Sequence, residues 1–291
     1  MTRSDLARKG LVTFAAATII ILTLAATFAP IVTPYDPCTI SLEDKFAPPS
    51  SEHILGCDHL GRDVFSRLIY GARVSMGSVA AIVTIIMTFG FAVGATAGFS
   101  GGRVDSVLMR ICDVFMTFPT FILAMFLIGV LGTGIVNVII AVSLTHWAWY
   151  ARIIRSLVLS LKNREYLLAA RVAGTSRIMI VVRHIIPPVF AQLSILATLD
   201  LGHMMMHVSG LSFLGLGITP PTPEWGVMIA DARQYVWTHP ELIMYPGLMI
   251  FIMVMAFNIL GDAMRDALDP HTANTTSTET TDSMLATPEA R

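Results

Sequence analysis

The sequence is poor in charge: Asp, Glu, Lys and Arg make up 13% of its 291 residues, while hydrophobic residues reach 54%. Soluble domains are typically about a quarter charged, so this composition predicts an integral membrane protein, in contact with a lipid bilayer along most of its length. The formal net charge is −1 and no basic face stands out. A nucleic-acid-binding function is therefore excluded.

Motifs of catalysis are also missing. There is no G-x-x-x-x-G-K-[ST] phosphate loop, so the chain cannot hydrolyse ATP by itself. His203 and His207 have the i,i+4 spacing of the H-E-x-x-H zinc proteases, but Met204 stands where the general-base Glu belongs. We predict that the chain alone is not an enzyme. A membrane-embedded metal enzyme that uses Asp200 as its carboxylate remains an alternative.

Long apolar segments organise the chain. A membrane-crossing helix needs about 20 residues, and six segments satisfy this: residues 11–33, 74–98, 107–131 and 134–158, a fifth within 179–218 and a sixth within 242–261. The first is followed by no small-residue cleavage site, which indicates an anchor. The fold class predicted is all-α, with six transmembrane helices. Polar residues interrupt the third to fifth segments: Asp113, His146, Arg152, Asp200 and His203.

Basic residues predict the orientation. If both termini are cytoplasmic, 14 of the 19 Lys and Arg residues lie on the cytoplasmic side and five on the outer side. Cytoplasmic loops of membrane proteins carry this excess. We therefore expect a cytoplasmic N-terminus over residues 1–10, a transmembrane domain over 11–270 and a disordered cytoplasmic tail over 271–291.

Two outer loops carry recognisable features. The loop 34–73 includes Phe65, Leu68 and Ile69, whose spacing predicts a short amphipathic helix lying on the membrane. The loop 219–241 contains Trp225 and Trp237, which suit a membrane interface.

The three cysteines give little information. Cys38 and Cys57 both fall in the loop 34–73, where an oxidising compartment would permit a disulfide. Two unpaired thiols are the alternative. Cys112 lies within a span, where packing is the expected role.

A cytoplasmic segment over 160–178, between the fourth and fifth spans, has the composition of a docking element. It lies within the stretch KNREYLLAARVAGTSRIMIVVRHIIPP. Ala169, Ala170 and Gly174 leave a shallow surface that a partner can approach closely. The charges that would orient a partner are those of Arg164, Arg171 and Arg177. An ordinary basic loop beside the membrane is the alternative.

This segment resembles the EAA loop of ABC importer permeases. Ala169, Ala170 and Gly174 match the pattern Glu-Ala-Ala and its Gly, Leu168 stands at the Glu position, and Ile186-Pro187 stands for Leu-Pro. The resemblance implies that residues 163–176 form the coupling helix, seated in a groove of a separate ATPase subunit. The residues it implicates in this coupling are Arg164, Glu165, Ala169, Ala170, Arg171, Gly174 and Pro187.

The resemblance extends over most of the chain. LGCDHLGRDVFSRLIYGARVS, LSFLGLG, PEWGVMI and GDAMRDALDP are similar to the C-type permeases of the peptide/nickel branch of ABC importers. THWAWYARIIRSL, DLGHMMMHVSG and ADARQYVW are similar to the nickel-transport permeases within that branch. This implies a type I permease fold in a bacterial plasma (inner) membrane. A dipeptide or oligopeptide permease is the alternative.

The resemblance also implies partners and cargo. A homologous B-type permease would supply the other half of the channel, two ATPase subunits would use ATP, and an extracytoplasmic nickel-binding protein would deliver the cargo. Nickel, free or chelated, would be transported by alternating access, and no cofactor would be bound by this chain.

The polar residues of the fifth span predict a substrate path. On a helix, Asp200, His203, Met204 and His207 share one face, because they stand at i, i+3, i+4 and i+7. Imidazole suits nickel, and His203 and His207 are the candidate metal ligands, with His146 as a further path residue. Such ligands must be transient, since conduction needs release. The alternatives are methionines that fill the core, histidines bonded between helices, and Asp200 paired with an Arg of the partner permease.

Overall fold

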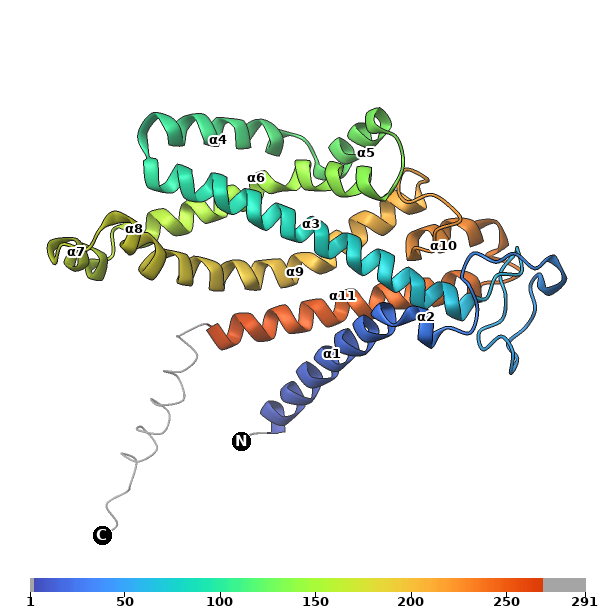
Figure 1. Ribbon diagram of the computed structural model, residues 1–291. Helices are drawn as coiled ribbons and strands as arrows, with labels where there is room; N and C mark the ends of the chain where they lie inside the picture. The colour runs from blue at the N-terminus through green and yellow to red at the C-terminus, as the bar shows by residue number, and fades with distance from the viewer. Residues whose placement is uncertain (1–2, 269–291) are drawn as a thin grey trace, which may run out of the picture.

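The computed structural model describes residues 3–268, and its backbone is mostly helical; among these residues one isolated bridge, between Cys57 and Asp63, is the only β pairing. Helices α3, α6 and α9 run through the middle, with α4 and α5 on one side and α1 and α11 on the other (Figure 1). The short helix α7 lies at one end, and α10 lies with the outer loop at the opposite end. The predicted disordered tail 271–291 falls outside the described residues.

The helix bounds in chain order are α1 (Arg3–Thr27), α2 (Ala29–Val32), α3 (Val64–Ser100), α4 (Gly102–Thr117), α5 (Thr120–Leu131), α6 (Ile135–Lys162), α7 (Glu165–Val172), α8 (Arg177–Ile180), α9 (Ile186–Phe213), α10 (Trp225–Ala232) and α11 (Glu241–Leu268). Short 3-10 turns occupy Leu42–Asp44 and Arg233–Tyr235, and a π-helical turn occupies Val181–Ile185.

Four stretches of the described chain are long and apolar enough to cross a membrane: Arg8–Thr27, Val64–Ser100, Ile178–Phe213 and Glu241–Leu268. The pair α4 and α5 makes a fifth if it counts as one bent span. Four or five of the six expected spans are therefore supported. The segment 134–158 does form most of α6, a helix of 28 residues, but His146, Arg152 and Arg155 dilute its apolar character.

The third expected span, 107–131, is two helices and not one. The axes of α4 and α5 differ by 86°. Phe118 takes an extended conformation (φ −95°, ψ 139°) before Pro119, as a residue preceding proline prefers, because the proline ring clashes with a helical predecessor.

Glycines let α3 and α6 pack closely. A Cβ placed on Gly94 would lie 2.3 Å from the carbonyl oxygen of Ala151, and one on Gly90 would lie 2.6 Å from the Cβ of Tyr150. The spacing of four residues puts both glycines on one face of α3. The two backbones can therefore approach each other, as small-residue interfaces permit in membranes.

The amphipathic surface helix expected in the loop 34–73 is absent. Residues 64–73 are the first turns of α3, whose N-cap Asp63 accepts a 2.7 Å hydrogen bond from the backbone N–H of Ser66. Leu68 and Ile69 are buried. With 37 residues, α3 is about 55 Å long, so it crosses a hydrocarbon core of about 30 Å and extends into the outer region.

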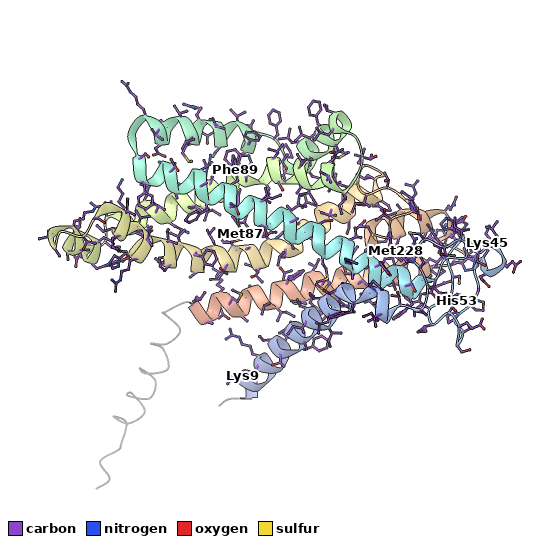
Figure 2. The ribbon with its side chains drawn as sticks, viewed as in Figure 1. Lys9, Lys45, His53, Met87, Phe89 and Met228 are labelled. Carbon is purple, nitrogen blue, oxygen red and sulfur yellow. The ribbon has the colours of Figure 1, made fainter. Side chains whose placement is uncertain are left out.

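The two loop tryptophans differ in environment. Trp225 is fully buried at the start of α10 and donates a 3.0 Å hydrogen bond from Nε1 to the carbonyl of Leu68. Its predicted interfacial position is therefore wrong, because it packs α10 onto α3. Met228, in the next turn, also lies against α3 (Figure 2). Trp237 is exposed, as an interfacial residue would be.

All three cysteines are free thiols. Cys38 is partly exposed, and its thiol donates to the carbonyl of Pro221, with Sγ and O 3.6 Å apart. Cys57 is buried, and burial together with Asp63 raises the pKa of its thiol to about 11. Of the two alternatives open for Cys38 and Cys57, the structure has the unpaired thiols.

Candidate substrate path and coupling segment

The candidate path residues of helix α9 differ in exposure. Asp200 and Met204 are buried, one turn apart. His203 is exposed and His207 is half-buried. The four positions fall within an arc of about 100°, so they share one face of the helix, and the boundary between the buried and the open surface of α9 runs through that face.

The open side of α9 holds the two histidines. Nδ1 of His207 lies 2.9 Å from the backbone carbonyl of His203, which can only accept, so Nδ1 carries the proton in this pair. Nε2 of His207 then presents a lone pair, as a metal ligand requires. Its ring meets Phe121 of α5 edge-on, with centroids 5.8 Å apart. Met206, on the same side, is 61% exposed.

The buried side of α9 meets α6 through a polar cluster. The hydroxyl of Tyr150 donates a 3.1 Å hydrogen bond to Oδ2 of Asp200. Nε2 of His146 lies 3.4 Å from the same oxygen, yet it is buried and makes no hydrogen bond. The structure thus brings together His146 and Asp200, which the sequence suggested separately. It adds Tyr150, which stands i,i+4 from His146 on α6.

Within residues 3–268, the side chains form no ready-made metal centre. The described residues contain no group of three or more His, Cys, Asp or Glu side chains placed to hold a metal ion. A zinc enzyme needs at least three protein ligands and a fourth open position. The alternative of a membrane-embedded metal enzyme is therefore not supported. Pairs of ligands suit a transported ion better, because the ion must leave.

Buried charges hold the outer loop to α10. Arg62 bonds to Asp58 at 2.7 Å and to Asp231 at 3.1 Å. Nη2 of Arg67 is 3.8 Å from Asp231 and has no hydrogen-bond partner. A cavity of about 20 Å³ lies beside these groups, room for one water. Burial lowers the pKa of His59, which lines the cavity.

Glu224 joins three helices at the outer end. It is fully buried, and Oε1 accepts hydrogen bonds from Ser75 of α3 at 3.0 Å and from Ser209 of α9 at 3.1 Å. Oε2 caps α10 by accepting from the N–H of Val227 at 3.0 Å. Sequence reasoning missed this residue, although an acidic side chain just before an apolar helical turn is an N-cap signal.

At the opposite end, the predicted coupling segment forms a short exposed helix. Helix α7 covers residues within the expected 163–176, and its Leu167 is buried against the rest of the chain. Ala169, Arg171 and Gly174 are exposed, and Val172 is 90% exposed. The helix leaves a small-residue surface open to solvent.

Gly174 ends this helix as a glycine should. Its φ is +82°, a conformation that side chains disfavour. The N–H of Gly174 donates to the carbonyl of Arg171, and that of Thr175 donates to Ala170, both at 3.0 Å. This pair of bonds is a Schellman motif.

The flanks of α7 are described in part. Arg164 is its N-cap and Glu165 its first residue; both are exposed and line an open hollow of about 680 Å³ with Tyr166. Pro187 lies in the first turn of α9. The side chain of Arg177 lies outside what the structure describes.

Residues 90–274 match the family of binding-protein-dependent transport system inner membrane components. The chain belongs to this family. It is therefore a permease subunit of an ABC importer in the inner membrane, not itself an enzyme, and it works with ATPase and substrate-binding partners. This agrees with the predicted family and membrane class.

The named relatives include permeases of metal import systems and a permease of a dipeptide system. The nickel transport system permease NikC of Escherichia coli K12 is 58% identical, covering 82% of this chain and 86% of that protein. The metal-staphylopine import permease CntC of Staphylococcus aureus NCTC 8325 is 40% identical over 83% and 84%. The dipeptide permease DppC of Alkalihalophilus pseudofirmus is 37% identical over 85% and 81%.

A solved structure supports the fold alone. A chain of the inward-facing MetNI methionine ABC transporter superposes with a TM-score of 0.54 at 17% identity, covering 70% of this chain and 97% of that one. The all-helical architecture of the described residues is therefore that of an ABC importer permease.

Proposed function

We propose that this chain is one permease half of a nickel importer. The observation that carries the proposal is the 58% identity to a nickel permease over 82% of the chain, against 37% for a dipeptide permease. The chemistry agrees, because His146 of α6 lies beside Asp200 of α9, and His203 and His207 lie on the open side of α9. Imidazole nitrogen is a good ligand for divalent nickel.

The other half of the path is a homologous B-type permease. Gln192 and His203 are polar and exposed, and both lie within the apolar stretch Ile178–Phe213. Polar side chains at membrane depth face a partner or a water-filled path, because lipid cannot hydrogen-bond them. The open side of α9 therefore fits an interface with the second permease, with the path between the two.

Coupling runs through α7. Its exposed Ala169 and Gly174 offer a close-approach surface for an ATPase subunit, and two such subunits serve the two permeases. Arg8 of α1 pairs with Asp266 of α11, so the two terminal helices meet near their chain ends. The pair puts these two helix ends on the same side of the membrane, and the excess of basic residues supports the cytoplasmic side.

Transport proceeds by alternating access. An extracytoplasmic nickel-binding protein docks on the outer loops and releases nickel, free or chelated, into an outward-open cavity. The path residues are Asp200, His203, Met204, His207 and His146, each a transient contact. ATP binding and hydrolysis at the partner subunits move α7, and the cavity then opens inward.

The test is uptake of radioactive nickel by cells that carry the complete transporter. A His203→Ala/His207→Ala double variant is compared with wild type, and Phe190→Ala serves as the control because it changes an exposed side chain of the same helix more than three turns away from His203. We expect the double variant to lose most nickel uptake at normal membrane levels, and the control to keep it. Full uptake in the double variant would remove these histidines from the path.

The second candidate is a dipeptide or oligopeptide importer, favoured by the 37% identity to a dipeptide permease. Dipeptides are therefore added as competitors in the same assay. If dipeptides enter and nickel does not, the cargo is peptide. If excess dipeptide leaves nickel uptake unchanged, this candidate fails.

A further inference from the structure

The cluster between α6 and α9 differs from the open histidines in one respect: it is already assembled within this chain. Asp200 is a carboxylate buried at membrane depth, and among the described side chains Tyr150 is its one hydrogen-bond donor. A buried carboxylate with a single neutral donor is incompletely compensated. A cation beside it would satisfy it.

His146 supplies the second ligand. Its Nε2 is buried without a hydrogen bond and lies 3.4 Å from Oδ2 of Asp200. A divalent ion bound about 2.1 Å from both a nitrogen and an oxygen holds them about 3.0 Å apart at a right angle and about 3.4 Å apart at a tetrahedral angle. The observed separation falls at the upper end of this range, so one ion could bridge both atoms after a small movement.

Tyr150 orients the carboxylate. Its side chain is fully buried, and its Cβ packs against Gly90 of α3. The hydroxyl donates to Oδ2, so it fixes the rotation of the carboxylate and leaves the second lone pair of that oxygen for a cation. Hydrogen bonds of this kind to a metal ligand typically set its orientation and affinity.

The two ligands stand on either side of the coupling segment. His146 and Tyr150 belong to α6, which ends at Lys162, and Asp200 belongs to α9, which begins at Ile186. Helix α7 lies between them in the chain and so connects the two helices. A movement of α7 that changes the separation of α6 and α9 would tighten or spread the distance between Nε2 and Oδ2.

We infer that His146 and Asp200 form a two-ligand contact for the transported divalent metal, with Tyr150 as its positioning residue and with water or a chelator completing the coordination. Opening and closing of α6 against α9 makes and breaks the contact once in each cycle. The inference rests on the proposed nickel transport and assigns its metal contact to a site separate from His203 and His207.

The test uses the complete transporter in proteoliposomes and measures nickel moved per ATP hydrolysed at saturating binding protein. The variants are His146→Gln and Tyr150→Phe. The control is Ser143→Ala, which removes a buried hydroxyl of α6 that, unlike the hydroxyl of Tyr150, makes no hydrogen bond. We expect the ratio to fall by roughly tenfold in His146→Gln and less in Tyr150→Phe. ATP hydrolysis stimulated by the binding protein persists, and the control matches wild type.

Three outcomes would overturn the inference. An unchanged ratio in His146→Gln shows that the pair does not touch the metal. A parallel fall of uptake and ATP hydrolysis in both variants shows a structural role. If the wild-type transporter moves dipeptide and not nickel, the proposed function fails, and this inference fails with it. Tyr150→Phe keeps the ring packing, so the test stands even if His146→Gln assembles poorly.

Discussion

The carboxylate of Glu224 accepts a hydrogen bond of 3.1 Å from the hydroxyl of Ser209. Ser209 lies near the outer end of α9 and Glu224 caps α10, so this bond fastens the outer loop to the helix that carries the path residues. Ser75 of α3 donates to the same oxygen. A single buried side chain therefore sets how three helices meet at the outer end.

Removing this acceptor should loosen the outer end. In Glu224→Ala, two hydroxyls and one backbone N–H lose their partner in a buried place, and each unsatisfied group costs about 1–3 kcal/mol. We expect the detergent-purified protein to have a lower melting temperature. Size-exclusion chromatography of heated samples measures it. Glu52→Ala is the control, since Glu52 is exposed. Equal melting of the two variants would contradict the role given to Glu224.

The contact of α3 with α6 gives a second prediction. Gly94→Ala places a methyl group 2.3 Å from the backbone oxygen of Ala151, and backbone cannot yield as a flexible side chain can. We expect a loss of about 1–3 kcal/mol of stability, as overpacking typically costs, seen as reduced membrane levels and a lower melting temperature. Gly77→Ala on the same helix meets nothing within 4 Å and should be neutral or slightly stabilising.

Cysteine labelling tests the free thiols. Cys38 is partly exposed, while Cys57 is buried and its pKa is raised from 9.0 to about 11. We expect maleimide at pH 8 to modify Cys38 well before Cys57, with labelling of Cys57 increasing as the pH rises toward 11. Folding favours the neutral thiol, so its stabilising contribution is full below pH 9.0 and is lost as the pH rises toward about 11. Protection of both thiols until reduction would show a disulfide instead.

The coupling surface gives a fourth prediction. Ala169 is exposed in this chain, so Ala169→Glu costs the chain itself little stability. At a close-approach surface the added carboxylate should block the ATPase groove, and we expect uptake and ATPase binding in pull-downs to fall several-fold at normal membrane levels. Ser106→Glu adds the same charge to α4, away from α7, and should leave both unchanged. Normal ATPase binding in Ala169→Glu would place the docking surface elsewhere.

The spans were predictable where composition alone decides. Long apolar segments predicted α1, α3, α9 and α11, because a helix needs about 20 predominantly apolar residues to cross the bilayer. The bend between α4 and α5 was harder to predict. Pro119 marks it, but a proline within an apolar segment is compatible with either a kinked helix or two separate helices. The start of α3 at Val64 was missed. A helix buried under an outer loop has the same spacing of apolar residues as an amphipathic helix on a membrane surface.

The site was predictable in kind and less so in arrangement. The histidines and Asp200 stand out because polar residues are rare in spans, yet periodicity gives only their position around the helix. Which side is buried depends on where α6 lies, and no local pattern contains that. Tyr150 and Glu224 escaped notice for a related reason: a tyrosine or a loop carboxylate is ordinary until a partner distant in sequence is known.

The measurement that bears most directly on the central claim is transport by the purified complex in proteoliposomes. The two permeases, the ATPases and the nickel-binding protein are combined, and radioactive nickel and a labelled dipeptide are followed separately. We expect nickel to accumulate only with ATP and to be unaffected by excess dipeptide. Accumulation of dipeptide without nickel would contradict the claim and would make this chain a peptide permease.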